Sequence, residues 1–192
     1  MRYPPEQKEK THARLVRRAS RRFRGRGGGV AIGDLMRELK LTHGGFYRHF
    51  NSKEQLFAEA VSQGFDEVIQ KISQAAGEAK PRGGLKAIIE AYLSPGHCAR
   101  PAEGCPGAAL VQEIARHPRP VRLKFEAAMR RYGGQLSPFL PGETGAERLM
   151  NFLVLFSGMA GALGLARAVV DKSLRQQILR SAREFYIRTF CG

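Results

Sequence analysis

The chain has 192 residues, of which 43% are hydrophobic, and its formal net charge is +15 at pH 7. This length allows one small domain and a larger one with its own core. The first residues, Met-Arg-Tyr-Pro-Pro-Glu-Gln-Lys, lack the apolar segment of a signal peptide, so we expect a cytoplasmic protein. No nucleophile–base pairing, metal-ligand spacing or phosphate-binding loop is visible, which argues against an enzyme. We therefore expect neither a cofactor nor a metal ion.

The N-terminal segment predicts two helices. In residues 6–23, three apolar side chains recur every fourth residue and form one buried face: Leu15, Ala19 and Phe23. Arginines cover the other faces, and the glycines from Gly25 to Gly29 end this helix. A second helix is predicted over residues 31–39, whose apolar residues follow helical spacing. Lys40 and Leu41 then form a tight turn.

Residues 41–53 carry the strongest functional signal, with the sequence Leu-Thr-His-Gly-Gly-Phe-Tyr-Arg-His-Phe-Asn-Ser-Lys. Thr42 can cap a short helix by accepting a hydrogen bond from a first-turn amide. Phe46 and Phe50 then fall on one face, which can enter a core. Two short helices joined by so brief a turn predict a helix-turn-helix, whose second helix lies in the major groove of DNA.

The start of the next helix predicts a phosphate clamp. Asn51 or Ser52 can cap that helix, and Lys53 falls in its first turn. A lysine there opposes the helix dipole, so its position needs a reason. A phosphate would supply one, because the free amides and the lysine both attract an anion.

The first 60 or so residues resemble the N-terminal DNA-binding domain of the TetR family of bacterial transcriptional regulators. The resemblance lies in one run of matching residue types and spacings: Thr42, His43, Gly44, Gly45, Phe46, Tyr47, Arg48, His49, Phe50, Ser52 and Lys53. The chain departs from the family pattern upstream. Val30-Ala31 stands where a threonine is usual, and Gly27–Gly29 lengthens a turn that is usually shorter.

The resemblance implies a role for each matching polar residue. It implies phosphate contacts for Thr42, Tyr47, His49 and Lys53. It implies contacts to base edges for His43, Gly44, Gly45 and Arg48. The alternative for the two glycines is that they only permit a tight turn into the helix. The implied partner is double-stranded DNA with a pseudo-palindromic operator, bound by a homodimer.

The positive charge is concentrated in the same region. Residues 1–56 hold 14 Lys and Arg against 5 Asp and Glu, a net charge of +9, and the other 136 residues carry only +6. Such a field attracts nucleic acid or an anionic surface without reading sequence. Charge alone therefore leaves an alternative open, a nonspecific basic protein that binds nucleic acid or a membrane surface.

The remaining sequence predicts six further helices and no strand. Their expected ranges are 53–79, 85–93, 106–117, 118–136, 145–169 and 172–190. The residues from 94 to 104 are expected to form a loop. The total is nine helices, as in the TetR family, in an all-α fold. We expect a helix-turn-helix domain at residues 1–54 and a helical domain for ligand sensing and dimerisation at residues 55–192.

The helix at residues 145–169 is nearly all apolar over its central part. Its length would suit a membrane span, but a buried helix at a two-fold interface covers the same apolar area more economically, so we expect no membrane partner. In the TetR family, the last two helices of each subunit form a four-helix dimer interface. The residues expected there are Phe152, Gly158, Gly161, Gly164, Leu165 and Phe185.

The second domain is expected to hold a pocket for a small-molecule effector of unknown identity. The expected lining combines aromatic, aliphatic and polar side chains: Phe65, Tyr92, His97, Leu110, Glu113, Phe125, Met129 and Phe156. The alternative is that these residues form an ordinary core. Ligand binding would change the separation of the two recognition helices.

The cysteines offer a second kind of signal. Cys105 falls where a helix begins, and exposed amides there lower the pKa of a thiol. It could therefore sense an electrophile or oxidant, with Cys98 as the resolving thiol. A Gly-Cys-Pro helix start also resembles a TetR subgroup with members that respond to electrophiles. The alternative is a small buried cysteine. The sequence thus predicts a repressor that a small molecule or an electrophile releases from its operator.

Overall fold

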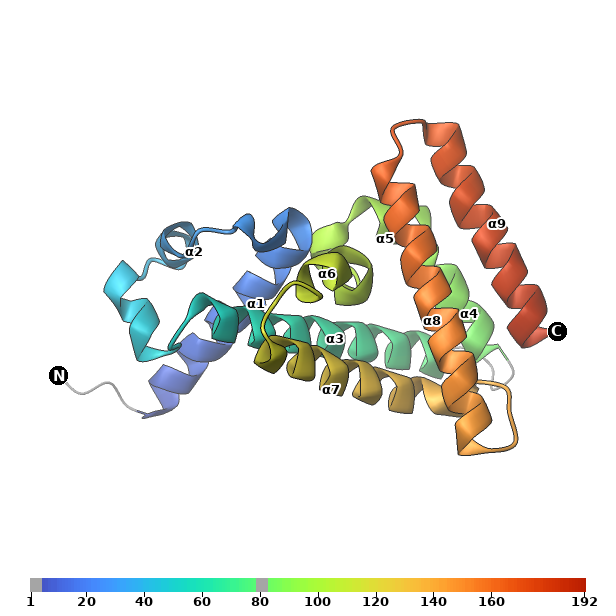
Figure 1. Ribbon diagram of the computed structural model, residues 1–192, viewed down its shortest axis with the longest axis horizontal. Helices are drawn as coiled ribbons and strands as arrows, with labels where there is room; N and C mark the ends of the chain where they lie inside the picture. Colours follow the sequence, from blue (N-terminus) through green and yellow to red (C-terminus); the bar gives the residue numbers. More distant parts are fainter. Residues whose placement is uncertain (1–4, 79–82) are drawn as a thin grey trace.

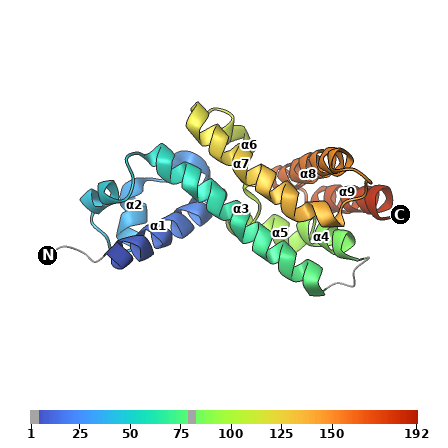
Figure 2. The same cartoon turned by 90° about the horizontal axis from the view of Figure 1, so that it is seen from below.

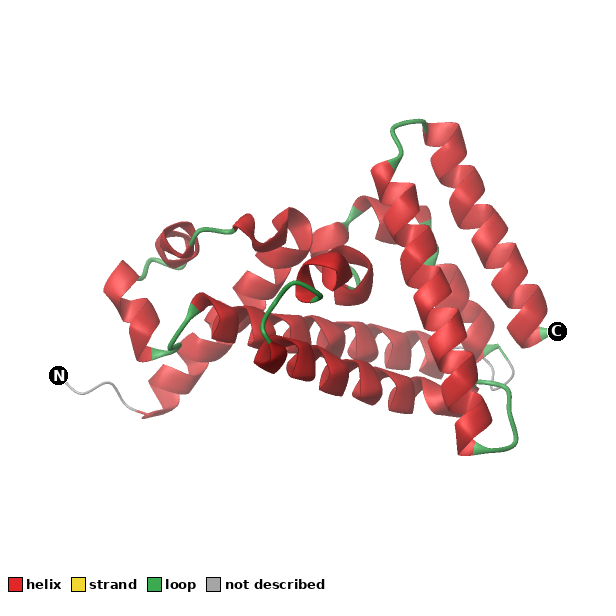
Figure 3. Cartoon of the chain, viewed as in Figure 1, coloured by secondary structure: helices red, strands yellow, loops and turns green. Residues whose placement is uncertain are grey.

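The computed structural model describes residues 5–78 and 83–192, and within these ranges the chain is helical without a strand (Figures 1 and 3). The described part contains nine α-helices and four short 3₁₀ segments, which confirms the predicted fold class. The α-helices are α1 (Pro5–Arg26), α2 (Ile32–Glu38), α3 (Lys53–Glu78), α4 (Gly84–Tyr92), α5 (Pro95–Ala99), α6 (Pro106–Ile114), α7 (Arg119–Leu136), α8 (Gly145–Ala168) and α9 (Lys172–Cys191). The 3₁₀ segments are η1 (Gly27–Gly29), η2 (His43–Arg48), η3 (Pro101–Glu103) and η4 (Ser137–Phe139).

The first three α-helices and η2 surround a common apolar core. The predicted stripe of α1 is buried, as are two residues of α2, one of η2 and the phenylalanine that follows η2: Leu15, Ala19, Phe23, Leu35, Met36, Phe46 and Phe50. The turn between α2 and η2 is tight because Lys40 adopts a left-handed conformation, with φ of 58°, and the Leu41 amide bonds back to the Met36 carbonyl at 2.8 Å. The helix-turn-helix geometry expected from the sequence is therefore present.

The second short helix of this motif is a 3₁₀ segment rather than an α-helix. Gly44 and Gly45 each disfavour an α-helix by about 1 kcal/mol relative to alanine, and short segments often adopt the tighter 3₁₀ form. Thr42 occupies the N-cap position, but its side chain makes no capping hydrogen bond. The predicted cap was wrong in this respect, because the Gly45 amide bonds to the backbone carbonyl of Thr42 at 3.0 Å instead.

The C-terminal helices form two paired layers beside this domain. α3 runs out of the N-terminal domain and lies against α7 along most of its length (Figure 2). α8 and α9 form an antiparallel hairpin, with a capping box at Thr144 and Glu147 starting α8 and Asp171 capping α9. α4 lies between α3 and α9, so it links the two layers.

The predicted loop at residues 94–104 contains a short helix, α5, and the 3₁₀ segment η3. Ser94 caps α5 by accepting a hydrogen bond from the His97 amide at 3.1 Å, and Pro95 occupies the first helical position. These two residues are ordinary signals for a helix start, which a reading of the segment as a loop overlooked. The segment matters because it forms one wall of a cavity described below.

Among the described residues, α8 is the one helix that is long and apolar enough to cross a membrane. Single helices of this kind also occur in the cores of soluble proteins. One face of α8 enters the core here, through Phe152, Leu155, Met159 and Leu163, while the capping box and the hairpin with α9 tie its ends into the helical fold.

Candidate nucleic-acid interface and effector pocket

The outer face of η2 is open to solvent. Tyr47 is 65% exposed, and the other exposed predicted residues on this surface are Thr42, His43, Gly44 and Arg48. Phe46 and Phe50 anchor the segment from beneath, with their rings stacked at a centroid distance of 5.4 Å. The exposed polar residues therefore lie above two buried, stacked phenylalanine rings. We call these exposed residues, together with Gly45, the recognition ridge.

The two glycines of the recognition ridge differ. A Cβ added at Gly45 would lie 3.3 Å from the Thr42 hydroxyl oxygen, so this position is closely packed. A Cβ at Gly44 would meet nothing within 4 Å. Packing therefore explains Gly45, whereas the protein fold alone does not require a glycine at position 44.

His49, another predicted phosphate contact, is half-buried, unlike the exposed Thr42 and Tyr47. Burial is the main cause that lowers the pKa of its imidazole, and the nearby His12, Lys8 and Arg48 lower it further. Its Nδ1 atom is buried without a hydrogen-bond partner among the described residues. At neutral pH this side chain is a neutral hydrogen-bonding group rather than a cation.

Lys53 lies at the start of α3, as predicted, and its ammonium donates a hydrogen bond to the Gly28 carbonyl at 2.6 Å. Ser52 caps α3 by accepting from the Gln55 amide at 3.1 Å, while the Gln55 side chain accepts from the Asn51 amide at 2.8 Å. Hydrogen bonds therefore fix the backbone around the start of α3, and the Lys53 side chain is held against the Gly28 carbonyl. A lysine ammonium has three donors, so two remain for a phosphate.

The arginines of α1 fall into three groups. Arg18 and Arg22 pair with Glu38 of α2, the latter at 2.9 Å, and hold the two helices together. Arg24 is buried, with a side chain only 1% exposed. The exposed arginines are Arg14, Arg17, Arg21 and Arg26. Four of the arginines of α1 are therefore solvated, and the other three bind groups of neighbouring segments.

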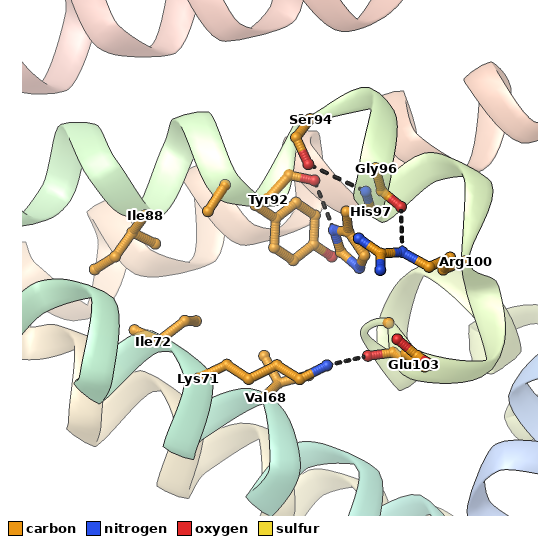
Figure 4. A pocket seen from close by; sticks show the side chains of 12 residues that line it. Val68, Lys71, Ile72, Ile88, Tyr92, Ser94, Gly96, His97, Arg100 and Glu103 are labelled. Atoms are coloured by element: carbon orange, nitrogen blue, oxygen red, sulfur yellow. Dashed lines mark hydrogen bonds between the residues drawn. The ribbon is translucent and has the colours of Figure 1, made fainter.

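A cavity of about 440 Å³ lies between α3, α4, α5 and η3 (Figure 4). Its lining residues are Val68, Lys71, Ile72, Ile88, Ala91, Tyr92, Ser94, Gly96, His97, Arg100, Glu103 and Gly104. Figure 4 shows Lys71 on the α3 side, facing Arg100 and His97 across the opening. This volume lies within the usual range for small-molecule sites.

Of the predicted ligand-binding residues, the cavity brings together Tyr92 and His97. The others lie elsewhere. Phe65, Leu110 and Phe156 are buried core residues, Phe125 packs on that core, and Met129 lines a separate groove between α7 and α8. Glu113 faces the N-terminal domain, where its carboxylate accepts from the Gly28 amide at 2.8 Å. Helical spacing identified buried faces but could not distinguish a core from a cavity wall.

Most of the polar lining of the cavity was not predicted from the sequence, especially Lys71, Ser94 and Arg100. Lys71 lies on the exposed side of α3, a position that reads as solvated surface. The other two lie in the segment expected to be a loop. Their charged or hydroxyl groups are visible in the sequence, but the fold that brings them to the cavity wall is not.

His97 holds the wall of the cavity together. Its Nδ1 lies 2.6 Å from the Tyr92 carbonyl, and its Nε2 lies 3.2 Å from the Cys105 amide. Because the amide must donate, Nε2 is the acceptor and Nδ1–H is the donor. Burial lowers the pKa of His97 to about 4, which outweighs the opposing hydrogen bond to Tyr92. The ring is neutral at pH 7 and links α4 to the start of α6.

The predicted thiol sensor is not supported by the environment of Cys105. Its side chain is fully buried, and burial raises the pKa of the thiol despite the nearby amides of α6. The sequence-based expectation of a lowered pKa was therefore wrong, because desolvation outweighs the helix start. Cys98 is also buried and both cysteines are free. The alternative, small buried cysteines, describes both positions.

Arg24 connects the cavity wall to the N-terminal domain. Its guanidinium donates to the Gly104 carbonyl at 2.8 Å and to the Glu67 carboxylate at 2.5 Å, and a third bond returns to Ser20 within α1. Gly104 is part of the cavity lining, so one buried side chain of α1 contacts both η3 and α3. A movement of this wall would therefore displace the end of α1 through the bond between Arg24 and Gly104.

One face of α8 remains exposed although it is apolar. Met150, Val154 and Leu165 are 58%, 55% and 63% exposed, and Gly161 lies on the same stripe. On α9, Phe185 is 52% exposed. We call this surface the α8–α9 face. It includes three of the residues predicted for the dimer interface, Gly161, Leu165 and Phe185.

The other predicted interface residues contact their own subunit. Phe152 is 2% exposed and stacks on Phe156 at 5.5 Å, so its assignment to the interface was wrong. Gly158 lies against the Tyr186 hydroxyl, which leaves no space for a side chain, and Gly164 faces α6. These glycines allow close packing inside the subunit, a role that their spacing alone could not distinguish from dimer contact.

Comparisons with known proteins agree with this geometry. Residues 15–60 match the model of the family described as bacterial regulatory proteins, tetR family. No curated protein matches the chain. Solved structures with a similar fold include a TetR transcriptional regulator from Chloroflexus aurantiacus (24% identity, 95% of this chain and 96% of that chain, TM-score 0.74). NemR of E. coli in its reduced form is also similar (19% identity, 94% and 97% coverage, TM-score 0.77). The resemblance to the TetR family is confirmed, since the matched residues include the whole recognition ridge.

Proposed function

We propose that this chain, whose residues 15–60 belong to the TetR family, is a sequence-specific transcriptional regulator that binds DNA as a homodimer. The observation that carries the proposal is the solvent-exposed recognition ridge on its buried aromatic base, inside the matched segment. In this proposal residues 1–54 bind DNA, and residues 55–192 sense an effector and dimerise. The protein acts in the cytoplasm, on DNA, and no catalytic activity is assigned to it.

The contacts to DNA divide into two groups. Thr42, Tyr47, His49 and Lys53 bind phosphates and set the register, while His43, Gly44, Gly45 and Arg48 face base edges. The free hydroxyl of Thr42 and the exposed ring of Tyr47 support the first group. Two such surfaces, related by a two-fold axis and about 34 Å apart, would read a pseudo-palindrome.

The regulatory part of the proposal is a repressor that a small molecule releases. It is supported by the cavity and by Arg24 of α1, whose guanidinium donates to the Gly104 carbonyl in the cavity wall. A ligand that favours one arrangement of this wall would favour one position of the DNA-binding domain. The buried thiol of Cys105 gives no comparable support to release by an electrophile.

Selection of genomic DNA fragments by the purified protein, followed by competition with random duplex, tests the function. A specific regulator holds its selected site about three decades more tightly than random DNA. Equal affinity for both would instead indicate the alternative, a nonspecific basic protein. Salt cannot separate the two, because both weaken as salt rises.

A further inference from the structure

We infer that the cavity between α3, α4, α5 and η3 binds an amphipathic organic anion, a molecule with one carboxylate group and an apolar body. The inference rests on the proposed effector role of this cavity and names the class of effector. Two cations face the cavity, Lys71 from α3 and Arg100 from the end of α5 (Figure 4). Neither forms an ion pair with any residue in the described part of the chain.

Both cations are held in place by neutral backbone groups. The Lys71 ammonium donates to the Glu103 carbonyl at 2.9 Å, and the Arg100 guanidinium uses Nε to donate to the Gly96 carbonyl at 3.2 Å. Each therefore keeps unused donors, two on the lysine and the terminal nitrogens on the arginine. A carboxylate can accept from both, and the guanidinium offers it a bidentate geometry.

The charge balance of the lining favours an anion over a cation. Glu103 is the one acidic residue in the lining, against Lys71 and Arg100, and its side chain is exposed. His97 adds no charge, because both ring nitrogens are used within the cavity wall. The net charge of +1 suits a monoanion, whereas an ammonium ligand would meet two like charges.

The opposite end of the cavity suits an apolar body. Ile72 lines it from α3 and Ile88 from α4 (Figure 4), and Val68 and Ala91 complete the apolar lining of the cavity. The Tyr92 ring stands at the boundary between the two halves (Figure 4). Apolar area buried by a ligand contributes about 25 cal/mol per Å², so this end supplies affinity while the cations fix the orientation.

A ligand bound in the cavity also affects the contact with the N-terminal domain. A carboxylate bound to the unused donors of Lys71 shifts an ammonium that also holds the Glu103 carbonyl, and so it acts on η3. The next residue, Gly104, holds Arg24 of α1 through its carbonyl. The anion therefore alters the contact that joins the cavity wall to the DNA-binding domain.

The test uses the purified 192-residue protein and probes that share an apolar body and differ in one group. We would titrate 2-naphthoate, 2-naphthalenemethanol and 2-naphthylmethylamine, and the matched set octanoate, octanol and octylamine, by calorimetry and thermal unfolding. Each carboxylate is expected to bind about tenfold or more tightly than its alcohol, and the amines more weakly still. Equal or tighter binding of the alcohols or amines, or no binding of either carboxylate, would overturn the inference.

Variants tie the preference to the two cations. Lys71→Met combined with Arg100→Gln should abolish the preference for carboxylate over alcohol, while Lys86→Met, an exposed cation of α4 outside the cavity, should retain it. Retention in the double variant would also overturn the inference. Operator selection on the same preparation keeps the two proposals separate. If the protein binds carboxylates but selects no DNA site, the proposed regulatory function is contradicted. If it selects a DNA site but does not prefer carboxylates, only the proposed class of ligand is contradicted.

Discussion

The amide of Gly28 donates to the Glu113 carboxylate at 2.8 Å, and the carbonyl of the same residue accepts from Lys53 at 2.6 Å. One glycine thus joins α6 of the C-terminal domain to the proposed phosphate contact at the start of α3. A side chain at position 28 would overlap the Glu113 carboxylate, and the preceding Gly27 has φ of 69°. The glycine run that departs from the family pattern therefore fits this connection.

Glu113→Ala should weaken operator binding because Lys53 loses its ordered anchor. We expect a loss of about 1 kcal/mol, or roughly fivefold, comparable to one imperfect phosphate contact. Lys53→Met removes a phosphate contact, so the slope of log binding constant against log salt concentration should fall in magnitude by about 1. Fluorescence anisotropy with the selected operator at several salt concentrations measures both effects.

A double-mutant cycle separates positioning from general stability. If Glu113 acts through Lys53, then Glu113→Ala should cost little affinity in the Lys53→Met background. Additive losses would show that the carboxylate only stabilises the fold. Tighter operator binding by Glu113→Ala would show that the bridge withholds Lys53 from DNA.

Gly44→Ala should separate DNA binding from folding. The added methyl meets nothing within 4 Å in the free protein, so the free energy of unfolding should change by no more than about 0.5 kcal/mol. On DNA the same methyl would lie between the recognition ridge and the base edges, and operator affinity should fall about tenfold. Gly134→Ala, which also meets nothing within 4 Å but lies on α7, is the matched control. Unchanged affinity for Gly44→Ala would remove this position from the interface.

The parts of the fold that sequence could predict are those with local signals. The stripe of Leu15, Ala19 and Phe23 and the aromatic pair beneath the recognition ridge are buried as their spacing indicates. The helix starts at Ser52 and Pro106 follow the same rule, since a cap or a first-turn proline acts within a few residues.

The cavity could not be predicted in this way because it depends on contacts between distant segments. Lys71 and Arg100 line one cavity because α3, α4, α5 and η3 pack around it. The error over Cys105 has the same origin. Its local position at a helix start favours a thiolate, but the surrounding helices bury it, and desolvation outweighs the local amides.

Arg24→Met should destabilise the protein by about 3 kcal/mol. The change leaves the Glu67 carboxylate, only 18% exposed, without its cation and the Gly104 carbonyl without a donor. Chemical denaturation followed by circular dichroism measures the loss. Arg17→Met, on the exposed face of the same helix, should stay within about 0.5 kcal/mol of the parent. Adding Glu67→Gln to Arg24→Met should restore part of the stability, and no recovery would argue against the ion pair as the cause.

His97 should make the protein less stable in mild acid. Its pKa is about 4 in the folded protein and 6.5 when unperturbed, so between these values the unfolded chain binds a proton that the folded protein does not. The stability from the neutral ring is fully present above pH 6.5 and is lost as pH falls toward 4. The full shift corresponds to about 3 kcal/mol, and partial exposure reduces our expectation to about 2 kcal/mol.

Urea denaturation of the parent and His97→Gln at several pH values isolates this contribution. The difference in unfolding free energy between the two proteins should be constant from pH 7 to 8 and should shrink between pH 6.5 and 4. Parallel curves across the acid range would exclude a lowered pKa for His97 as the origin of the acid sensitivity.

Leu165→Asp should convert the proposed dimer into a monomer. The side chain is 63% exposed on the α8–α9 face, so an aspartate there is tolerated by the isolated subunit but would be buried against a second copy at a cost of several kcal/mol. Loss of two-site engagement should weaken operator binding about a hundredfold or more. Sedimentation equilibrium and anisotropy measure the two effects. Leu123→Asp, at an apolar position of α7 that is 44% exposed, should remain dimeric with parental affinity. If Leu165→Asp stayed dimeric, the subunits would have to pair through another surface, and that surface would set the separation of the two recognition ridges.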